Sequence, residues 1–285
     1  MLIAHSIPDL RAALAGRGRP AFVPTMGNLH DGHIALVRQA KPLGDVMVAS
    51  IFVNRLQFLP HEDFDSYPRT WEADCARLEA AGCDVLFAPR ESDLYPEPQT
   101  FKVQPDPQLA DILEGHFRPG FFTGVCTVVM KLFSAVFFGA DAGGTAVFGK
   151  KDYQQLMVIR RMVQQFALPL EVVAGDTQRA ADGLALSSRN GYLDAAQRVQ
   201  SIELAHALRA LAQAALAPAA PPLAELEQQA LQALARQGWT PDYLTVRQRH
   251  DLLPPPAGTP PRPGTLVALG AARLGTTRLI DNLEF

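Results

Sequence analysis

Two histidines, His30 and His33, are the residues whose type and spacing first suggest chemistry. They lie in "VPTMGNLHDGHIALV" (23–37), where an apolar segment gives way to one with helical periodicity. Three-residue spacing puts both imidazoles on one side of a helix's first turn, and a helix N-terminus offers N–H groups to a phosphate. Gly27 and Gly32 remove side chains where the backbone must approach a ligand. The stretch therefore predicts donors that stabilise charge on phosphoryl oxygens.

Two other interpretations of the histidine pair stay open. A strand, a glycine turn and a helix with two solvated histidines would look the same. An H-x-x-H pair can also bind a metal ion, although no further cluster of ligands supports it here. The dinucleotide fingerprint G-x-G-x-x-G and the P-loop signature G-x-x-x-x-G-K-[ST] are both missing, so the stretch belongs to neither of those classes.

Neutral amides follow a second apolar run. Asn54 and Gln57 stand in "SIFVNRLQF" (50–58), at the predicted carboxyl end of a strand. Amides hydrogen-bond hydroxyls and carboxylates without adding charge. They predict contacts to a small polar substrate, with ordinary polar loop residues as the alternative.

A third strand-to-helix junction carries charge. Lys150, Lys151 and Asp152 stand in "VFGKKDYQQL" (147–156), with Gln155 one turn into the predicted helix. A lysine there neutralises phosphate charge, and the aspartate caps the helix or holds a ribose or the lysine. A capped helix with solvated lysines is the alternative.

Hydroxyls and a guanidinium come together in "DGLALSSRNGYL" (182–193), which contains Ser187, Ser188 and Arg189. This combination is typical of a phosphate-binding group, whereas a helix cap followed by a turn is the plainer interpretation. A serine nucleophile is not expected, because no G-x-S-x-G elbow is present.

The composition sets limits on the class of protein. Hydrophobic residues make up 48% of the 285 residues and the net charge is −3, which supports a sizeable core and gives no basic bias toward nucleic acid. The three cysteines form no C-x-x-C pair, so we expect reduced thiols rather than a zinc site or disulfides. Neither a secretory signal nor a membrane span is apparent, so we expect a cytoplasmic protein.

Apolar runs alternate with amphipathic runs through the first 177 residues. This pattern predicts an α/β fold, a Rossmann-like parallel sheet with helices on both faces. Ligands of such sheets bind at the carboxyl ends of the strands, where the histidine pair, the two amides and the Lys150–Asp152 group fall. The predicted strands are 21–25, 45–53, 83–89, 145–149 and 168–173, and the predicted helices are 31–41, 69–82, 124–138 and 151–166.

The pattern changes after residue 177, and the remainder predicts a smaller α+β C-terminal domain over 178–285. We expect one long helix over 194–216, a linker over 217–222 and a helix over 223–238, with strands at 242–247 and within 264–285. The segment 254–263 holds six prolines and excludes helix and central strand.

Taken together, five segments in this order resemble the pantoate–β-alanine ligase family, within the H-x-G-H nucleotidyltransferase superfamily. They are "PTMGNLHDGH", "SIFVNRLQF", "YPRTWEAD", "VFGKKDYQQL" and "DGLALSSRNGYL", and beyond about residue 200 the ending "RLIDN" continues the match. The resemblance implies that ATP and pantoate give pantoyl adenylate and pyrophosphate, and that β-alanine then displaces AMP to give pantothenate. It also implies Mg²⁺ with ATP, a homodimer, a catalytic domain over 1–177 that binds nucleotide and pantoate, and a lid domain over 178–285.

The resemblance also assigns roles residue by residue. It gives catalysis to His33, His30 and Lys151. It gives pantoate and β-alanine binding to Pro24, Thr25, Gln57 and Gln155, and it matches Asp74 to the magnesium region. The positions matched to ATP are Met26, Gly27, Asn28, Leu29, His30, Asp31, Gly32, His33, Gly149, Lys150, Lys151, Asp152, Leu186, Ser187, Ser188 and Arg189.

The chain departs from the family pattern at a few positions. Lys150 stands where glutamate is common, so the added charge is expected to alter nucleotide affinity. The segment "GDTQR" (175–179) replaces a more apolar hinge. Other departures are Arg55 for a proline, Phe121 and Thr123 where His and Arg are common, and a longer surface loop at 137–145.

Two competing functions remain. A sister transferase would adenylylate a phosphate ester instead of a carboxylate, although the amides at Gln57 and Gln155 suit a small hydroxy acid better. A regulatory protein that binds nucleotide without turnover is the second, and the intact His30, His33 and Lys151 argue against it.

Overall fold

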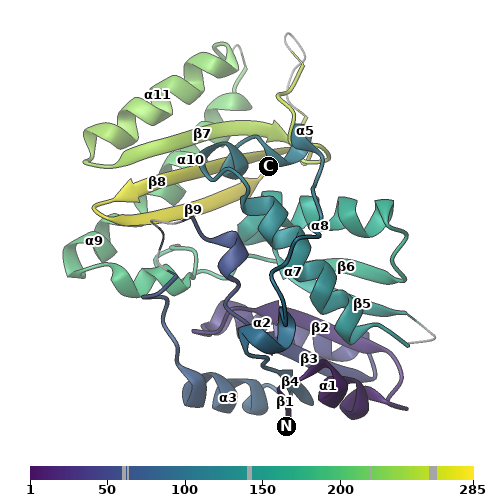
Figure 1. The fold of residues 1–285 in the computed structure, drawn as a ribbon. Coiled ribbons are helices and arrows are strands. Elements are labelled where there is room, and N and C mark those ends of the chain that lie inside the picture. Colours follow the sequence, from purple (N-terminus) through teal and green to yellow (C-terminus); the bar gives the residue numbers. More distant parts are fainter. Residues whose placement is uncertain (60–61, 63, 140–142, 219, 257–261) are drawn as a thin grey trace. The chain divides into compact units, whose positions relative to one another are not determined.

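The computed structural model describes all residues except 60–61, 63, 140–142, 219 and 257–261. The chain divides into two compact units (Figure 1). The first unit comprises residues 1–150 and 154–177, and the second comprises 151–153 and 178–285. Within the described part of the chain, none of the helices has the length and apolar character needed to span a membrane.

A six-stranded sheet forms the centre of the first unit, and all its strand pairs are parallel, which confirms the predicted α/β fold. The strand order is β1-β4-β3-β2-β5-β6. The order reverses at β2 and β5, which is where such sheets bind their ligands. The strands are β1 (Leu2–Ala4), β2 (Pro20–Thr25), β3 (Val46–Ile51), β4 (Val85–Phe87), β5 (Gly144–Gly149) and β6 (Leu170–Gly175).

Helices cover both faces of this sheet because successive strand residues point to opposite faces. In β2, Phe22 meets the aromatic rings of Phe133 and Phe137 at the end of α7, while Val23 joins the core cluster that contains Val37 of α2. The helices are α1 (Ile7–Leu14), α2 (Asp31–Ala40), α3 (Trp71–Ala80), α4 (Glu91–Leu94), α5 (Pro107–Ala110), α6 (Glu114–Phe117), α7 (Phe121–Val136) and α8 (Tyr153–Gln165), with 3₁₀ turns η1 (Lys41–Leu43), η2 (Arg55–Gln57) and η3 (Lys150–Asp152).

Helix α2 lies close to the carboxyl ends of β5 and β6. Gly149 and Gly175 are in register on these two strands. A Cβ at Gly175 would fall 2.1 Å from the Leu36 side chain, and one at Gly149 would fall 3.7 Å from it. A side chain at Gly175 would therefore have to displace the Leu36 and Gln39 side chains of α2.

Strand β1 and helix α1 are among the elements of the first unit that were not predicted, as are the short helices α4, α5 and α6. Strand β1 is only three residues long with one buried side chain, too short to show a period. Helix α1 does carry a start signal: Ser6 Oγ accepts a hydrogen bond from the Asp9 N–H at 3.2 Å, in the "SIPD" stretch. The predicted long loop at 137–145 includes residues 140–142, which lie outside the described residues.

The second unit contains an antiparallel sheet in the order β7-β8-β9, formed by β7 (Thr240–Gln248), β8 (Leu266–Leu274) and β9 (Thr277–Glu284). Helices α10 (Glu203–Ala215) and α11 (Leu223–Arg236) share a core cluster with it, and α9 (Ala195–Gln200) and η4 (Ser188–Tyr192) precede them. The proline-rich stretch 254–263 lies between β7 and β8, and its residues 257–261 lie outside the described residues.

The single long helix predicted over 194–216 is wrong. It is interrupted after Gln200, and α10 begins at Glu203. Ser201 is fully buried and its hydroxyl donates to the Arg198 carbonyl at 2.7 Å. A serine hydroxyl that bonds a nearby carbonyl competes with the helical backbone pattern, which accounts for the break.

Candidate active site

The two histidines cap helix α2 reciprocally. His30 is the N-cap, and its Nδ1 accepts a hydrogen bond from the Gly32 N–H at 3.2 Å. His33 Nδ1 in turn accepts from the His30 N–H at 3.3 Å. The ring centroids are 4.0 Å apart. The pair therefore performs the function that serine and glutamate perform in an ordinary capping box.

These contacts fix the tautomers of the histidines. A ring nitrogen that accepts a hydrogen bond carries no proton, so each neutral imidazole holds its proton on Nε2. His30 and His33 thus offer Nε2–H groups as donors. Two such donors at the N-terminus of a helix suit an oxyanion whose charge increases during a reaction.

A buried carboxylate holds the turn between β2 and α2. Asp74, on α3, is 2% exposed. Its Oδ2 accepts from the Asn28 N–H and its Oδ1 from the Leu29 N–H, both at 2.8 Å. The turn needs this support, because Gly27 and Asn28 both have positive φ, +82° and +51°. Sequence reasoning missed this positioning role of Asp74.

Two features of the structure favour glycine at position 27 of this turn. Besides its positive φ, a Cβ at Gly27 would lie 3.1 Å from Ile51 Cγ2 and 3.2 Å from Asp74 Oδ2. The Gly27 N–H also donates to Thr25 Oγ1 at 3.2 Å, and Thr25 Oγ1 donates to the Ser50 carbonyl of β3 at 2.7 Å. The turn is therefore anchored at both ends.

The amide predicted for substrate binding lies against this turn. Gln57 Nε2 contacts Met26 Sδ at 3.0 Å, so the structure brings together groups from the ends of β2 and β3. Asn54 is 1% exposed and supports the arrangement: its Nδ2 donates to Gln57 Oε1 and to the Gly124 carbonyl, both at 3.2 Å, and its Oδ1 accepts from Tyr95 at 3.1 Å.

Two departures from the family pattern meet in one ion pair. Lys150 Nζ lies 2.9 Å from Asp176 Oδ1. The pairing follows from the sheet, because Gly149 and Gly175 are in register and the next residue of each strand is charged. Lys150 therefore brings a charge that Asp176 balances.

Phe121, another departure, also has a structural role. The Arg118 guanidinium lies 3.7 Å from the centroid of the Phe121 ring and pairs with both carboxylate oxygens of Glu62 at 2.7 and 2.8 Å. The ring therefore packs against a cation that is already paired.

Gln155, the second amide predicted to bind substrate, is half-buried near the start of α8, also in the first unit.

The second unit contains Lys151 and the segment 187–189, which were also predicted to bind the nucleotide. Lys151 and Ser187 line one small cavity of about 10 Å³, room for about one water molecule. Ser187 caps η4 by accepting from the Arg189 N–H at 3.2 Å, and the Leu186 N–H donates to the Gln178 carbonyl at 2.9 Å. Ser187 therefore acts as a cap, as the plainer interpretation of this segment predicts.

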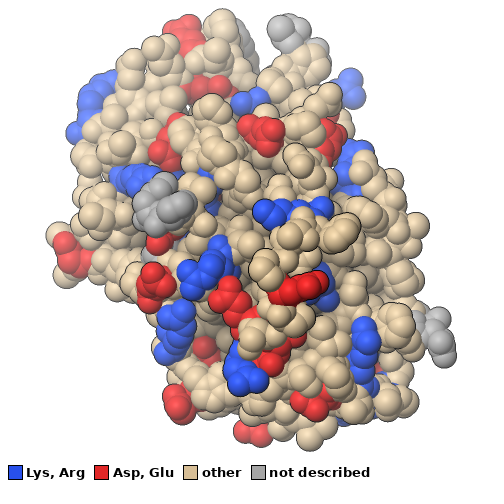
Figure 2. Space-filling view, viewed as in Figure 1, with Lys and Arg blue, Asp and Glu red and all other residues tan. Residues whose placement is uncertain are grey.

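Charged groups of both signs are interspersed on the face of the molecule that Figure 2 shows. Figure 2 shows Lys and Arg beside Asp and Glu over the visible face, without a large area of one sign.

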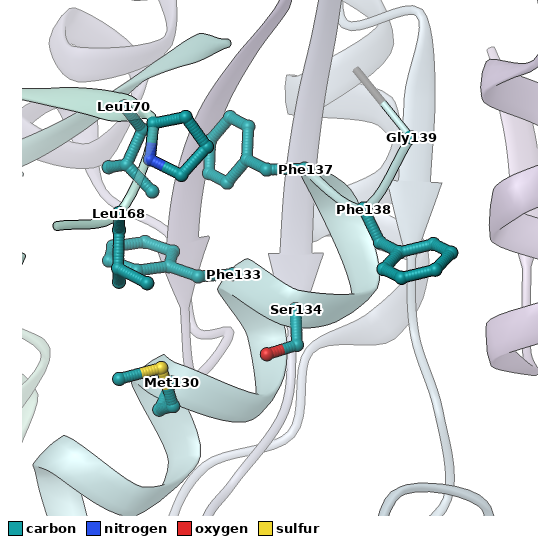
Figure 3. Close-up of a pocket in the computed structure, with 9 residues that line it drawn as sticks. Met130, Phe133, Ser134, Phe137, Phe138, Gly139, Leu168 and Leu170 are labelled. Carbon is teal, nitrogen blue, oxygen red and sulfur yellow. The ribbon is translucent and has the colours of Figure 1, made fainter. Parts of the chain in front are cut away.

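A separate cavity of about 390 Å³ lies at the amino end of β6 and is lined largely by apolar groups, including Met130, Phe133 and Leu168 (Figure 3). The described residues that line it include no charged side chain, so they offer no counter-charge to a phosphate.

The cysteines give a testable expectation about reactivity. Burial raises the pKa of Cys126 to about 12 and that of Cys83 to about 11, so neither forms a thiolate near neutral pH. Cys75 is half-buried, and its pKa is raised by burial and by Asp74. We expect a maleimide at pH 7.5 to modify Cys75 slowly and the other two only after unfolding, as measured by peptide mass mapping. Rapid labelling of Cys126 in the native protein would contradict this.

Comparison with known proteins identifies the family. The pantoate–β-alanine ligase family matches residues 2–284. The pantothenate synthetases of Paracidovorax citrulli (strain AAC00-1) and Verminephrobacter eiseniae (strain EF01-2) are 76% and 72% identical over 285 residues, which is 100% of this chain and of each relative.

Solved structures give the same result. The crystal structure of pantothenate synthetase from Thermus thermophilus has a TM-score of 0.89 at 44% identity and covers 100% of this chain and 99% of that chain. The pantoate–β-alanine ligase of Francisella tularensis, complexed with β-γ ATP and β-alanine, has a TM-score of 0.78 at 33% identity and covers 100% and 97%. This chain belongs to the pantoate–β-alanine ligase family, the ATP-dependent enzymes that join pantoate to β-alanine.

Proposed function

We propose that this chain forms pantothenate in two steps, through pantoyl adenylate, and that His30, His33 and Lys151 are its catalytic residues. The observation that carries the proposal is the reciprocal cap of His30 and His33, which assigns an Nε2–H donor to each ring at the start of α2. The remaining ATP contacts are proposed for 26–33, 149–152 and 186–189. Pantoate and β-alanine are proposed to contact Pro24, Thr25, Gln57 and Gln155.

The first step needs no general base. Pantoate is a carboxylate, with an ordinary pKa of about 4, so it is already ionised at pH 7. Its oxygen attacks the α-phosphate and pyrophosphate leaves. The protein's contribution is alignment and charge stabilisation. The imidazole donors, the Lys151 ammonium and the Arg189 guanidinium supply that stabilisation.

Magnesium enters this proposal with the nucleotide. Both Asp74 oxygens accept backbone N–H bonds, and among the described residues no group of three His, Cys, Asp or Glu side chains is arranged to hold a metal ion. A Mg²⁺ ion that keeps several waters and binds chiefly to phosphate oxygens fits such a site. When bound, it would neutralise phosphate charge. We propose that Asp74 supports the turn between β2 and α2 and does not bind the ion directly.

The second step consumes the adenylate. The β-alanine amine must lose a proton before or during its attack on the acyl carbon, and AMP then leaves. The adenylate must also be kept from water, which suits a lid. We propose that lid function for residues 178–285 and the catalytic function for residues 1–177. A homodimer in the cytoplasm is proposed as well, on the basis of the family resemblance.

The proposed function is tested by measuring pyrophosphate release from Mg·ATP. We expect no release with ATP alone, a single burst when pantoate is added, and sustained turnover only when β-alanine is also present. The matched control replaces pantoate with a hydroxy acid esterified at its carboxyl group, which cannot attack. Release that depends on a phosphorylated acceptor instead of pantoate would move the chain to a sister transferase. ATP binding without any release would make it a regulatory protein.

A further inference from the structure

The segment Lys151–Tyr153 belongs to the second unit, although the residues on both sides of it belong to the first. Two side chains of strand β9 account for this. Asn282 Nδ2 donates to the Lys151 carbonyl at 2.8 Å, and Tyr153 Oη donates to Glu284 Oε1 at 2.9 Å. The backbone that carries the proposed phosphate-binding lysine is therefore held by the last strand of the chain.

The main chain of Asn282 is itself held by a partly buried ion pair between Arg179 and Asp281. Arg179 donates to both oxygens of Asp281 at 2.7 and 2.8 Å and to the Asn282 carbonyl at 3.1 Å. Asp281 Oδ1 also accepts from the Asn282 N–H at 2.8 Å. Asp281 and Asn282 are 5% and 6% exposed. Because the acceptor at Lys151 is a carbonyl, the amide must present its NH₂ group there.

We propose that Asn282 is a positioning residue for adenylate formation, which orients the main chain of Lys151 so that its ammonium meets the phosphates. This inference rests on the function proposed for Lys151. A lysine side chain has four flexible carbons, so the placement of its charge depends on a fixed backbone. A shift of about 1 Å in a positioned group can lower a rate by about 10².

The other end of the segment, Tyr153, is held by Glu284 of the same strand. Glu284, which accepts from Tyr153, also pairs with Arg249 at 2.9 Å. Burial raises the pKa of the Tyr153 phenol, so it stays a neutral donor at the pH of the reaction. Asn282 and Glu284 lie on the same strand two residues apart, so β9 holds the segment at both Lys151 and Tyr153.

The test uses Asn282→Ala, Asn282→Asp, Lys151→Ala and the Lys151→Ala/Asn282→Ala double variant of the full chain. Asn282→Asp keeps the size of the side chain but places an oxygen against the Lys151 carbonyl. Asn282→Ser, too short to reach that carbonyl, replaces the alanine variant should it not fold. Leu274→Ala is the matched control, because Leu274 is buried at 4% exposure in the core of the same unit. The readouts are the single-turnover rate of adenylate formation, KM for ATP, and Tm.

We expect Asn282→Ala to slow adenylate formation by about 10-fold to 10²-fold, and Asn282→Asp to slow it at least as much. The double variant should be no slower than Lys151→Ala, because Asn282 acts through Lys151. Leu274→Ala should lower Tm and leave the rate of the folded enzyme near normal. Losses that multiply in the double variant, or a normal rate in Asn282→Ala, would overturn the inference and leave the proposed function intact. A normal rate in Lys151→Ala would overturn both.

Discussion

Replacing His33 with alanine is expected to slow formation of pantoyl adenylate by about 10² or more, the scale of losing a donor to a developing oxyanion. The same change removes the acceptor for the His30 N–H, so it should also cost about 1 kcal/mol of stability, as loss of a helix cap does. The alanine variant alone cannot separate these effects. The rate is measured in a single turnover with Mg·ATP and pantoate, and stability by thermal unfolding.

Two further substitutions separate the cap from the chemistry. Asparagine at 33 places an acceptor near the position of Nδ1 but nothing at Nε2, whereas glutamine reaches the Nε2 position and leaves Nδ1 empty. We expect His33→Asn to keep most of the Tm and lose the rate, and His33→Gln to lose Tm and keep part of the rate. If rate followed Tm in both variants, His33 would be only a structural cap. A near-normal rate in His33→Ala would remove it from the catalytic residues.

The sequence is sufficient to predict the parallel sheet and the position of its ligand groups, because both depend on local patterns. Apolar runs are long enough to mark β2, β3 and β5, and the polar residues after them have to lie near the carboxyl ends of those strands. The first-turn position of His30 and His33 also follows from their spacing. These features need no knowledge of distant parts of the chain.

Contacts between distant residues account for what the sequence did not reveal. Nothing local in "KKD" (150–152) indicates that Lys151 is held by Asn282, 131 residues later. The Lys150–Asp176 pair is visible only once β5 and β6 are placed in register. The break at Ser201 depends on burial of its hydroxyl, since the surrounding letters favour a continuous helix.

Replacing Asp74 with alanine is expected to have the second large effect, on stability as well as on rate. The change leaves the N–H groups of Asn28 and Leu29 without their acceptor. An unsatisfied buried donor costs about 1–3 kcal/mol, so the free energy of unfolding should fall by about that much for the buried Leu29 N–H, and by a smaller amount for the half-buried Asn28 N–H. Adenylate formation should slow as well, because the turn that ends in His30 loses its support. Denaturant unfolding and the single-turnover rate measure the two effects.

Thr70→Val is the matched control for Asp74→Ala. It removes only the hydroxyl that donates to Asp74 Oδ1 at 3.1 Å and leaves both backbone bonds in place, so it should cost about 1 kcal/mol. The magnesium dependence then decides between the two roles of Asp74. A metal ligand predicts normal stability and a rate that recovers as Mg²⁺ is raised. A turn support predicts lost stability and a rate that Mg²⁺ does not restore, because added metal cannot supply an acceptor to the N–H groups of Asn28 and Leu29.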